Sequence, residues 1–282
     1  MTHAFDLADL KKLLRNNLFL DLDSHALSET AHGLVCDFLD IRLSSAFQPV
    51  IDAASNKVLG REALLRASAH DVADCTANAA FERAEEARSL VQFDRLLRTL
   101  HLLNHACSFA ADELLFLNVH PRLLVRVNDH GRTFEQILHY YSVPPERIVI
   151  EISENSVDDK RRLFDAVNNF RNVGYKVAID DFLPGRASLE RVLELKPDIV
   201  KLDGRLIRDA EHVVSGKGVV YGLVDILRSK GAGVVIQGIE TAEQADIALR
   251  SGADGLQGYY LGQPAFPANT DERLGQGEPL AA

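Results

Sequence analysis

Polar side chains stand at the ends of most of the short apolar runs in this sequence. The chemically useful ones are Glu62, Asn118, Glu151, Asp180, Asp181, Lys201, Asp203, Gln237, Glu240 and Gln257. Carboxylate and amide oxygens without Cys or His ligands suit hard ions such as Mg2+ or Mn2+. An Asp shared by two such ions, held about 3.5–4 Å apart, is a frequent arrangement for cleaving a phosphodiester. The pattern therefore indicates a divalent-metal site that acts on a phosphate ester.

Each of these residues alone has an ordinary structural explanation, since an Asp after a strand is usually a helix N-cap. Their convergence changes that interpretation, because crowded carboxylates repel each other and raise their own pKa values unless cations lie among them. Lys201 either positions an attacking water or balances charge in the acidic cluster, and the two roles are compatible. Arg66 suits a phosphate clamp or a structural salt bridge.

Short apolar runs alternate with helical patterns along the chain and supply the elements that must position these side chains. The eight runs cover residues 45–51, 58–66, 114–120, 148–153, 176–182, 199–203, 233–240 and 255–261. Apolar strands that alternate with helices predict a parallel sheet that is buried on both faces. Eight of them predict a TIM-like (β/α)8 barrel of the α/β class, in which the C-terminal strand ends meet at one mouth.

The two-residue period of a strand sharpens this prediction. Glu62, Leu64 and Arg66 share one face of their strand. Asp180 and Asp181 are adjacent and must point in different directions, so we expect Asp180 inside the mouth and Asp181 at its rim. The site is therefore predicted to have an inner carboxylate layer and an outer edge.

The remaining segments define the predicted domain boundaries. Residues 1–44 are predicted to be helical, because Leu7, Leu10 and Leu14, and later Leu27 and Leu34, recur at helical spacing. These helices form a cap, a dimerisation element or a layer packed on the barrel. Residues 69–80 are predicted to form a loop over the mouth. The barrel domain is expected to span 45–265, and 266–282 to be a poorly structured tail.

The bulk composition excludes some classes of function. The 282 residues include 41 acidic and 31 basic side chains, which give a formal charge of −10. A surface that coats DNA or RNA needs clustered Lys and Arg, so neither nucleic acid is an expected partner. Three separated cysteines and no signal-peptide or membrane-span pattern predict a cytoplasmic protein without membrane contact.

Eight ordered motifs resemble the EAL family, which takes its name from Glu-Ala-Leu. They are Phe47-Gln48-Pro49-Val50, Glu62-Ala63-Leu64, Leu117-Asn118-Val119, Glu151-Ile152-Ser153-Glu154, Asp180-Asp181-Phe182, Lys201-Leu202-Asp203, Gly238-Ile239-Glu240-Thr241 and Gln257-Gly258-Tyr259. They cover about residues 45–265. The resemblance implies a barrel whose first strand is antiparallel to the others. It also implies a cyclic di-GMP-specific phosphodiesterase, which hydrolyses this ligand to linear pGpG with two Mg2+ or Mn2+ ions.

The resemblance also assigns roles to individual residues. The implied metal ligands are Glu62, Asn118, Glu151 and Asp180 for one ion, with Asp180, Asp181 and Gln237 near the second. Lys201 would position the water and, with Glu62, Asp180 and Asp181, complete the catalytic set. The implied ligand-binding residues are Gln48, Leu64, Arg66, Asp203, Gln257, Tyr259 and Pro264, and the loop-anchoring residues are Glu154 and Glu240.

Two departures from the family pattern leave the activity open. Gln237 stands where the family has Glu, which removes one negative charge near the second ion. Residues 183–188 replace the family's Gly-Thr-Gly-Tyr-Ser, and Pro184 restricts the backbone there. The sequence therefore supports a phosphodiesterase of reduced activity, a cyclic di-GMP receptor that does not cleave it, or a protein-interaction module. A homodimer or a regulatory protein partner is compatible with each.

Overall fold

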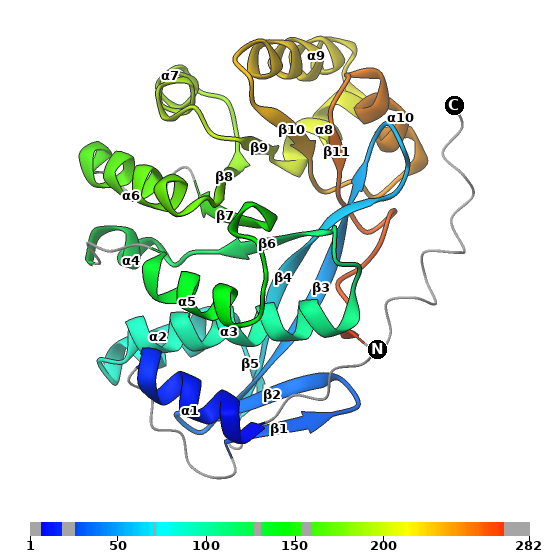
Figure 1. The fold of residues 1–282 in the computed structure, drawn as a ribbon. Coiled ribbons are helices and arrows are strands. Elements are labelled where there is room, and N and C mark those ends of the chain that lie inside the picture. The colour runs from blue at the N-terminus through cyan, green and yellow to red at the C-terminus, as the bar shows by residue number, and fades with distance from the viewer. Residues whose placement is uncertain (1–6, 19–25, 70–71, 127–130, 154–158, 268–282) are drawn as a thin grey trace.

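Eight strands in the described part of the chain close into a barrel (Figure 1). The computed structural model describes residues 7–18, 26–69, 72–126, 131–153 and 159–267. The barrel strands are β3 (Ile41–Asp52), β4 (Val58–Ala69), β6 (Leu114–Asn118), β7 (Ile148–Ser153), β8 (Lys176–Phe182), β9 (Ile199–Leu202), β10 (Gly233–Ile236) and β11 (Gly255–Leu256). They pair in the order β3-β11-β10-β9-β8-β7-β6-β4, and the pairing of β3 with β4 closes the ring.

The strand directions confirm the predicted barrel type. Strand β3 is antiparallel to both of its ring neighbours, β4 and β11. The other neighbouring pairs in the ring are parallel. This is a (β/α)8 barrel with its first strand antiparallel, as the sequence predicts.

Helices cover the outside of the ring (Figure 1). They are α1 (Leu7–Leu18), α2 (Ala77–Glu86), α3 (Leu90–Ser108), α4 (Pro121–Arg126), α5 (Arg132–Tyr140), η1 (Pro145–Arg147), α6 (Lys160–Val173), α7 (Arg186–Leu195), α8 (Gly204–His212), α9 (Val214–Ser229) and α10 (Ala242–Arg250). Helix α6 illustrates why they form: Leu163, Val167 and Phe170 are buried at helical spacing. The Asp159 side chain caps its N-terminus, and Gly174 ends it with a φ of 103°.

An apolar plug fills the barrel interior. Six strands contribute one buried residue each: Val50, Phe116, Val149, Ala178, Ile199 and Val235. The larger core lies between the strands and the helices and contains residues such as Ile150, Val200 and Val234 on the opposite strand faces. Because the plug leaves no open pore, polar side chains on the inward faces can gather only beyond it, at the two ends of the barrel.

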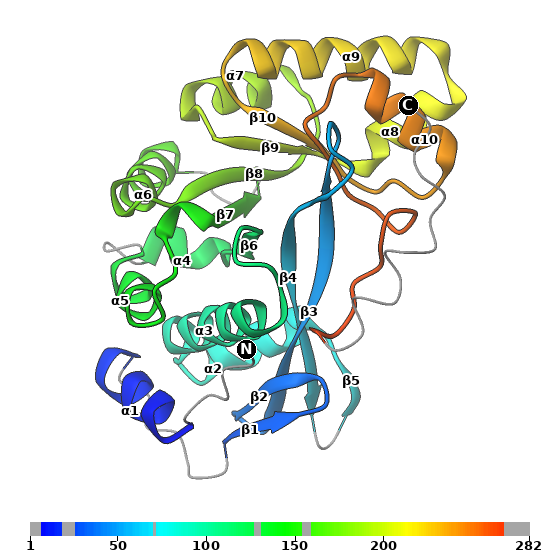
Figure 2. The same ribbon diagram turned by 45° about the vertical axis from the view of Figure 1, so that its right-hand side comes forward.

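Strands β3 and β4 extend beyond the ring and carry a smaller sheet (Figure 2). Strand β2 (Gly33–Phe38) pairs with β3, β1 (Leu27–Thr30) pairs with β2, and β5 (Val72–Cys75) pairs with β4, all antiparallel. A second apolar cluster joins this extension to α1 and α3 through residues such as Leu14, Cys36, Leu43 and Phe93. The extension is therefore packed with the helices on its own core.

The prediction that residues 1–44 are helical is confirmed at α1 but wrong for residues 27–44, which contain β1, β2 and the start of β3. Leu34, Cys36 and Phe38 also recur at the two-residue spacing of a strand, and together they face the second cluster. A two-residue turn at Leu39 and Asp40, with φ values of 52° and 59°, connects β2 to β3. Long-range pairing with β3 decides between the two periodicities, and a local pattern does not contain that information.

The predicted loop at 69–80 is also wrong. Strand β4 continues to Ala69, β5 returns alongside it, and α2 begins at Ala77. At the other end, Phe47 and Ala265 exchange backbone hydrogen bonds of 2.8 and 3.0 Å, and most of the predicted 266–282 tail lies outside the described residues. Within the described residues, no helix combines the length and apolarity needed to cross a bilayer.

A buried polar network attaches the small sheet to the barrel. The Asn104 amide on α3 accepts from the backbone N–H of Leu34 at 2.7 Å and donates to the Leu34 carbonyl at 2.9 Å. It also donates to Ser45 Oγ at 3.1 Å, and Ser45 Oγ hydrogen-bonds His101 Nδ1 at 2.7 Å. Burial lowers the pKa of His101 to about 3, so its imidazole is neutral. We call Ser45, His101 and Asn104 the latch.

Candidate active site

The predicted site residues form a layer directly above the apolar plug. Asn118, Glu151, Asp180, Lys201 and Gln237 each follow a plug residue of the same strand by two positions. Residues two apart share a strand face, so the first four are directed inward on the C-terminal side of the plug. Gln237 lies just past the end of β10, and its hydrogen bond to Asp180 places it in the same layer. Across the β3–β4 pairing, Gln48 lies opposite Glu62 and joins the same layer. The structure thus brings the inner members of the predicted site together.

Lys201 is the centre of this layer. Its side chain is fully buried, and its ammonium lies 2.7 Å from Glu62 Oε2, 2.5 Å from Glu151 Oε1 and 3.5 Å from Asp180 Oδ1. Below it, the Phe116 ring of the plug lies 5.7 Å away. The charge-balancing role predicted for Lys201 is therefore observed. One ammonium faces three carboxylates, which leaves an excess of negative charge.

Amide side chains complete the layer. Gln257 Nε2 donates to Glu62 Oε2 at 2.8 Å, and Asn118 Nδ2 donates to Glu62 Oε1 at 3.1 Å. Gln48 bridges to the loop after β11 by donating to the Gly262 carbonyl at 3.1 Å. These bonds fix the orientation of Glu62 on both of its oxygens.

Three oxygens in this layer have no hydrogen-bond partner among the described residues. They are Glu151 Oε2, Gln237 Oε1 and Gln257 Oε1, and all three are buried. Buried acceptors without partners are costly, and a hard cation satisfies them well. No three His, Cys, Asp or Glu side chains of the described chain are arranged to hold one metal ion. The amide oxygens must therefore contribute, and the residues present fit a divalent ion on those terms.

The pKa values of Glu151 and Glu62 shift in opposite directions. Burial raises the pKa of Glu151 well above its usual value, and the neighbouring Glu62 and Asp180 charges add to the increase despite Lys201. Burial acts in the same direction on Glu62, but Lys201 and the Gln257 and Asn118 hydrogen bonds outweigh it and lower the pKa. The three carboxylates raise the pKa of Lys201 well above its usual value despite its burial, so the ammonium stays charged. An added cation would relieve the repulsion at Glu151.

Asp181 lies at the rim, next to Asp180. Asp180 is 7% exposed, whereas Asp181 is exposed and has a φ of 51°, inside a register irregularity of β8 against β9. Burial and the charges of Asp180 and Asp203 raise the pKa of Asp181. A non-glycine residue with positive φ is strained, and this strain turns a second carboxylate toward the same mouth.

Gln237 hydrogen-bonds Asp180, one of the expected metal ligands. Its Nε2 donates to Asp180 Oδ1 at 3.0 Å. Asp180 is the residue that the sequence predicts as shared between two ions. The amide therefore takes up one lone pair of that carboxylate, which a Glu at position 237 could not do.

The predicted ligand-binding residues lie around this centre. Leu64 and Arg66 continue the Glu62 face of β4 outward, and the exposed Arg66 donates to the Leu65 carbonyl at 3.2 Å. Tyr259 is 60% exposed beyond β11, and Pro264 is half-buried. Asp203 caps α8 by accepting from the Arg205 backbone N–H at 2.7 Å, which is the ordinary role of an Asp after a strand. Its contact with a ligand stays a prediction.

The loop-anchoring predictions have mixed outcomes. Glu154 lies outside the described residues. The Glu240 side chain is exposed, and its backbone N–H donates to Gln244 Oε1 at 2.7 Å. Gln244 and Thr241 in turn donate to Glu211 of α8 at 2.7 and 2.9 Å. The anchor that sequence reasoning missed is therefore Gln244, and the Thr-x-x-Gln spacing of a helix capping box was its signal.

The predicted loop 183–188 is shorter than expected, because α7 begins at Arg186. A close glycine contact then joins the loops after β9 and β10: a Cβ on Gly238 would lie 2.8 Å from the Gly204 Cα. The predicted strands at 233–240 and 255–261 also end early, at Ile236 and Leu256. Gln237 and Gln257 thus lie just past their strands, where the backbone turns outward and Gly238 has a φ of 68°.

The comparison with protein families decides the affiliation. The EAL domain family matches residues 37–264, from β2 to the segment that pairs with β3. This chain belongs to the EAL-domain family. Its relatives include the Bacillus subtilis EAL-domain protein YkuI, 28% identical over 224 residues. The probable cyclic di-GMP phosphodiesterase PdeA of Escherichia coli is 29% identical over 149 residues, or 52% of this chain. The matched part of this chain spans 54% of the length of YkuI and 20% of the length of PdeA.

Solved structures of other EAL proteins share the fold. YkuI in complex with cyclic di-GMP and calcium superposes with a TM-score of 0.66 at 28% identity, over 80% of this chain and 56% of YkuI. BlrP1 of Klebsiella pneumoniae, also with calcium and the dinucleotide, gives 0.66 at 25% identity, over 80% of this chain and 56% of BlrP1. A standalone EAL protein of Vibrio cholerae gives 0.70 at 24% identity, over 82% and 95% of the two chains, and supports the fold alone.

Proposed function

We propose that this EAL protein hydrolyses cyclic di-GMP to linear pGpG with the help of two Mg2+ or Mn2+ ions. The observation that carries the proposal is the layer above the plug. Glu62, Glu151 and Asp180 surround one ammonium, and Glu151 Oε2 and Gln237 Oε1 are buried without a hydrogen-bond partner among the described residues. Relatives named as probable cyclic di-GMP phosphodiesterases, and the YkuI complex with this dinucleotide, support the choice of substrate.

The chain's own residues divide the work. Glu62, Asn118, Glu151 and Asp180 would hold one ion once their carboxylates turn from Lys201 toward it, because no three carboxylates of the described residues are arranged around one ion in this structure. Asp180 with Asp181 would reach the second ion. When bound, the ions would lower the pKa of a water and stabilise negative charge on the phosphate. The Lys201 ammonium orients the carboxylates through its contacts with Glu62, Glu151 and Asp180, and would position the attacking water.

The extended β3–β4 face offers the surface for the dinucleotide. Gln48, Leu64 and Arg66 lie along this face, from the buried layer to solvent. Among the described residues, the Arg66 guanidinium makes one 3.2 Å bond, to a backbone carbonyl, and keeps donors available for a phosphate. The ligand roles of Asp203, Gln257, Tyr259 and Pro264, a cytoplasmic location, and a homodimer or regulatory partner belong to the same proposal.

A second candidate is a cyclic di-GMP receptor with little hydrolysis. The hydrogen bond from Gln237 to Asp180 favours it, because binding of the second ion must break that bond or share its acceptor. The amide also contributes no charge toward that ion. Dinucleotide binding through the β3–β4 face would be unaffected.

Chromatography of the reaction products separates the two candidates. Purified protein is incubated with cyclic di-GMP and excess Mg2+ or Mn2+, beside Gln237→Glu and a Glu62→Gln control. We expect linear pGpG from the wild type, about ten times more from Gln237→Glu, and none from Glu62→Gln. Tight binding in calorimetry without product from the wild type would establish the receptor. If no form binds the dinucleotide, both candidates fail and the protein-interaction module remains.

A further inference from the structure

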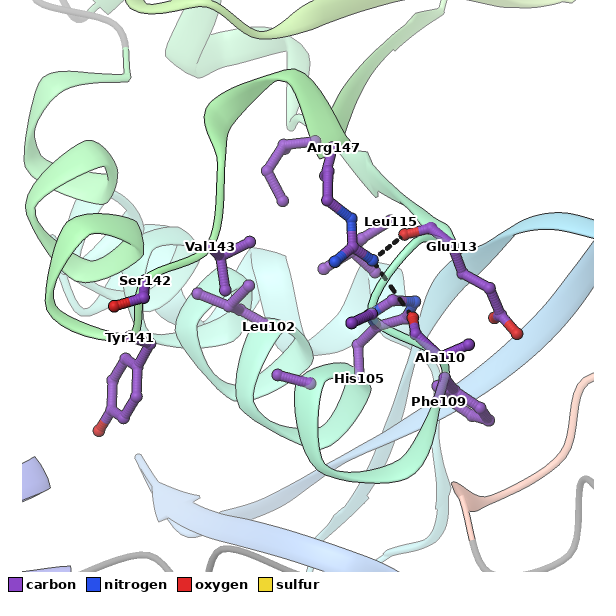
Figure 3. Close-up of a pocket in the computed structure, with 13 residues that line it drawn as sticks. Leu102, His105, Phe109, Ala110, Glu113, Leu115, Tyr141, Ser142, Val143 and Arg147 are labelled. Atoms are coloured by element: carbon purple, nitrogen blue, oxygen red, sulfur yellow. Dashed lines mark hydrogen bonds between the residues drawn. The ribbon is translucent and has the colours of Figure 1, made fainter. Parts of the chain in front are cut away.

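A cavity of about 180 Å3 lies outside the ring between α3, the segment that follows α5, and η1 (Figure 3). Leu115 of β6 and Ile148 of β7 line it, and each precedes by three residues an active-site oxygen donor on its strand, Asn118 and Glu151. The cavity therefore lies at the N-terminal ends of these strands, whereas the active site is at their C-terminal ends. Cyclic di-GMP chemistry does not involve it.

Two basic side chains enter this cavity, whose other lining residues are apolar apart from Glu113, Tyr141 and Ser142. His105 of α3 and Arg147 of η1 both line it, and Figure 3 shows the guanidinium beside the imidazole. Arg147 donates through Nη2 to the Ala110 and Glu113 carbonyls. Its Nε, and Nε2 of His105, are buried without a hydrogen-bond partner among the described residues. Groups of this kind call for an acceptor in the cavity.

The neighbouring charges favour a negatively charged acceptor. Glu113 also lines the cavity, but its carboxylate pairs with Arg61 at 2.7 Å, and the Arg61 guanidinium lies 4.0 Å from the Phe109 ring. Burial and the Arg147 and Arg61 charges lower the pKa of His105 to about 3. The imidazole is therefore neutral and donates through one nitrogen, and a half-turn of the ring exchanges the nitrogen that faces the cavity.

The apolar lining residues favour a ligand with a short carbon chain. Leu102, Phe109 and Val143 are among the apolar lining residues. An apolar cavity of about 150 Å3 accommodates a benzene molecule, so this one admits a short carbon chain. A phosphate, with three strong acceptor oxygens, needs more donors than one guanidinium edge and one imidazole provide. A carboxylate needs two.

We propose that this cavity is a second ligand site, which binds a small monocarboxylate between Arg147 and His105. The carboxylate accepts from the guanidinium and from the imidazole N–H, and its short apolar chain packs against Leu102, Phe109 and Val143. The bound ligand then touches the starts of β6 and β7, below the strands that carry Asn118 and Glu151.

Nuclear magnetic resonance of the imidazole tests this site. The full chain is labelled with 15N, and the His105 ring signals are assigned by their loss in His105→Gln. Sodium butyrate is then titrated at constant ionic strength against sodium chloride. We expect a saturable shift of the His105 signals in the millimolar range. Butyramide, which has the same shape without the charge, and inorganic phosphate should bind at least about tenfold more weakly than butyrate in the same titration.

Two variants keep the result independent of folding. Ala106→Leu fills the cavity from an exposed position of α3 and should abolish the shift, whereas Ala79→Leu at an exposed position of α2 should leave it unchanged. Arg147→Gln should weaken the binding of butyrate about tenfold or more. The proposal is overturned if butyrate gives no saturable shift, if Ala106→Leu responds like the wild type, or if butyramide or phosphate binds as well as butyrate.

Discussion

Two buried polar clusters of this EAL protein contrast in how fully they are satisfied. In the latch, each hydrogen-bonding atom of the Asn104 amide has a partner, and the buried His101 is neutral. In the active-site layer, three carboxylates face one ammonium, and three oxygens have no hydrogen-bond partner among the described residues. The latch consists of neutral side chains, whereas the active-site layer is centred on carboxylates and one ammonium. This difference distinguishes a cluster that ties α3 to β2 and β3 from one built to receive charge.

The comparison also shows why buried polarity alone does not identify a site. A satisfied network stabilises one arrangement of the chain, whereas an unsatisfied one lowers stability until a ligand completes it. Removing a latch residue should therefore lower stability without changing ligand affinity. Changing a residue of the active-site layer should instead change how strongly a bound cation stabilises the protein. Four experiments test this expectation.

Lys201→Met should give the largest effect. Without the ammonium, Glu62 and Glu151 face each other in a buried space, so we expect the free energy of unfolding to fall by about 3–5 kcal/mol in urea titrations with chelator. Added Mn2+ should recover part of the loss, because a cation replaces the missing charge. Equal stability of the variant and the wild type in chelator would remove the argument for a charge excess.

Asn104→Ala should weaken the latch without touching the site. It leaves the Leu34 N–H and carbonyl without partners, and we expect a loss of about 1–3 kcal/mol in the free energy of unfolding. Calorimetry should give an unchanged affinity for cyclic di-GMP. Asn78→Ala at an exposed position of α2 serves as the matched control. A latch variant that lost nucleotide affinity would show that the two clusters are coupled.

Gln237→Glu sharpens the comparison by making the site still less satisfied. The new carboxylate loses the bond to Asp180 and adds repulsion, so the variant should be less stable than the wild type by about 1 kcal/mol in chelator. In Mn2+ the order should reverse, with an ion affinity about tenfold higher by calorimetry. A variant that is equally stable with and without ions would show that position 237 does not contact them.

The pH dependence of stability should reveal the latch histidine. The pKa of His101 is lowered to about 3 in the folded protein, against about 6.5 when unfolded, so only the unfolded chain takes up its proton between these values. Its contribution is complete above pH 6.5 and is lost as the pH falls toward 3. Between pH 6 and 5, the decrease in unfolding free energy should be about 1.2 kcal/mol smaller in His101→Gln than in the wild type. Identical slopes would mean that His101 is already accessible to protons.

The inner part of the site was predictable from sequence because barrel geometry gives strand ends a common destination. Alternation placed Asp180 inside and Asp181 outside, and the structure has this arrangement. The bond between Gln237 and Asp180 was not predictable, because Gln237 follows the end of β10, where the two-residue period no longer applies. The anchor at Gln244 did have a local signal, the Thr-x-x-Gln spacing at the start of α10, but its bond to Glu211 of α8 is a contact between distant segments.

The fold outside the ring was harder to predict. Leu27 and Leu34 fit a helix and a strand equally well, and only pairing with β3 and the Asn104 bonds select the strand. The cavity beside His105 and Arg147 also has no local signature, since it combines α3 with a segment about 40 residues later. Such features depend on contacts between distant segments, which periodicity does not encode.

Anomalous diffraction from crystals grown with Mn2+ and cyclic di-GMP would test the central claim most directly, that the active-site layer is built to receive divalent cations. The account predicts manganese peaks within coordination distance of Glu151 Oε2 and Asp180, with a ligand phosphate beside them. Crystals that hold the dinucleotide in the mouth while Lys201 alone occupies the space between Glu62, Glu151 and Asp180 would contradict it.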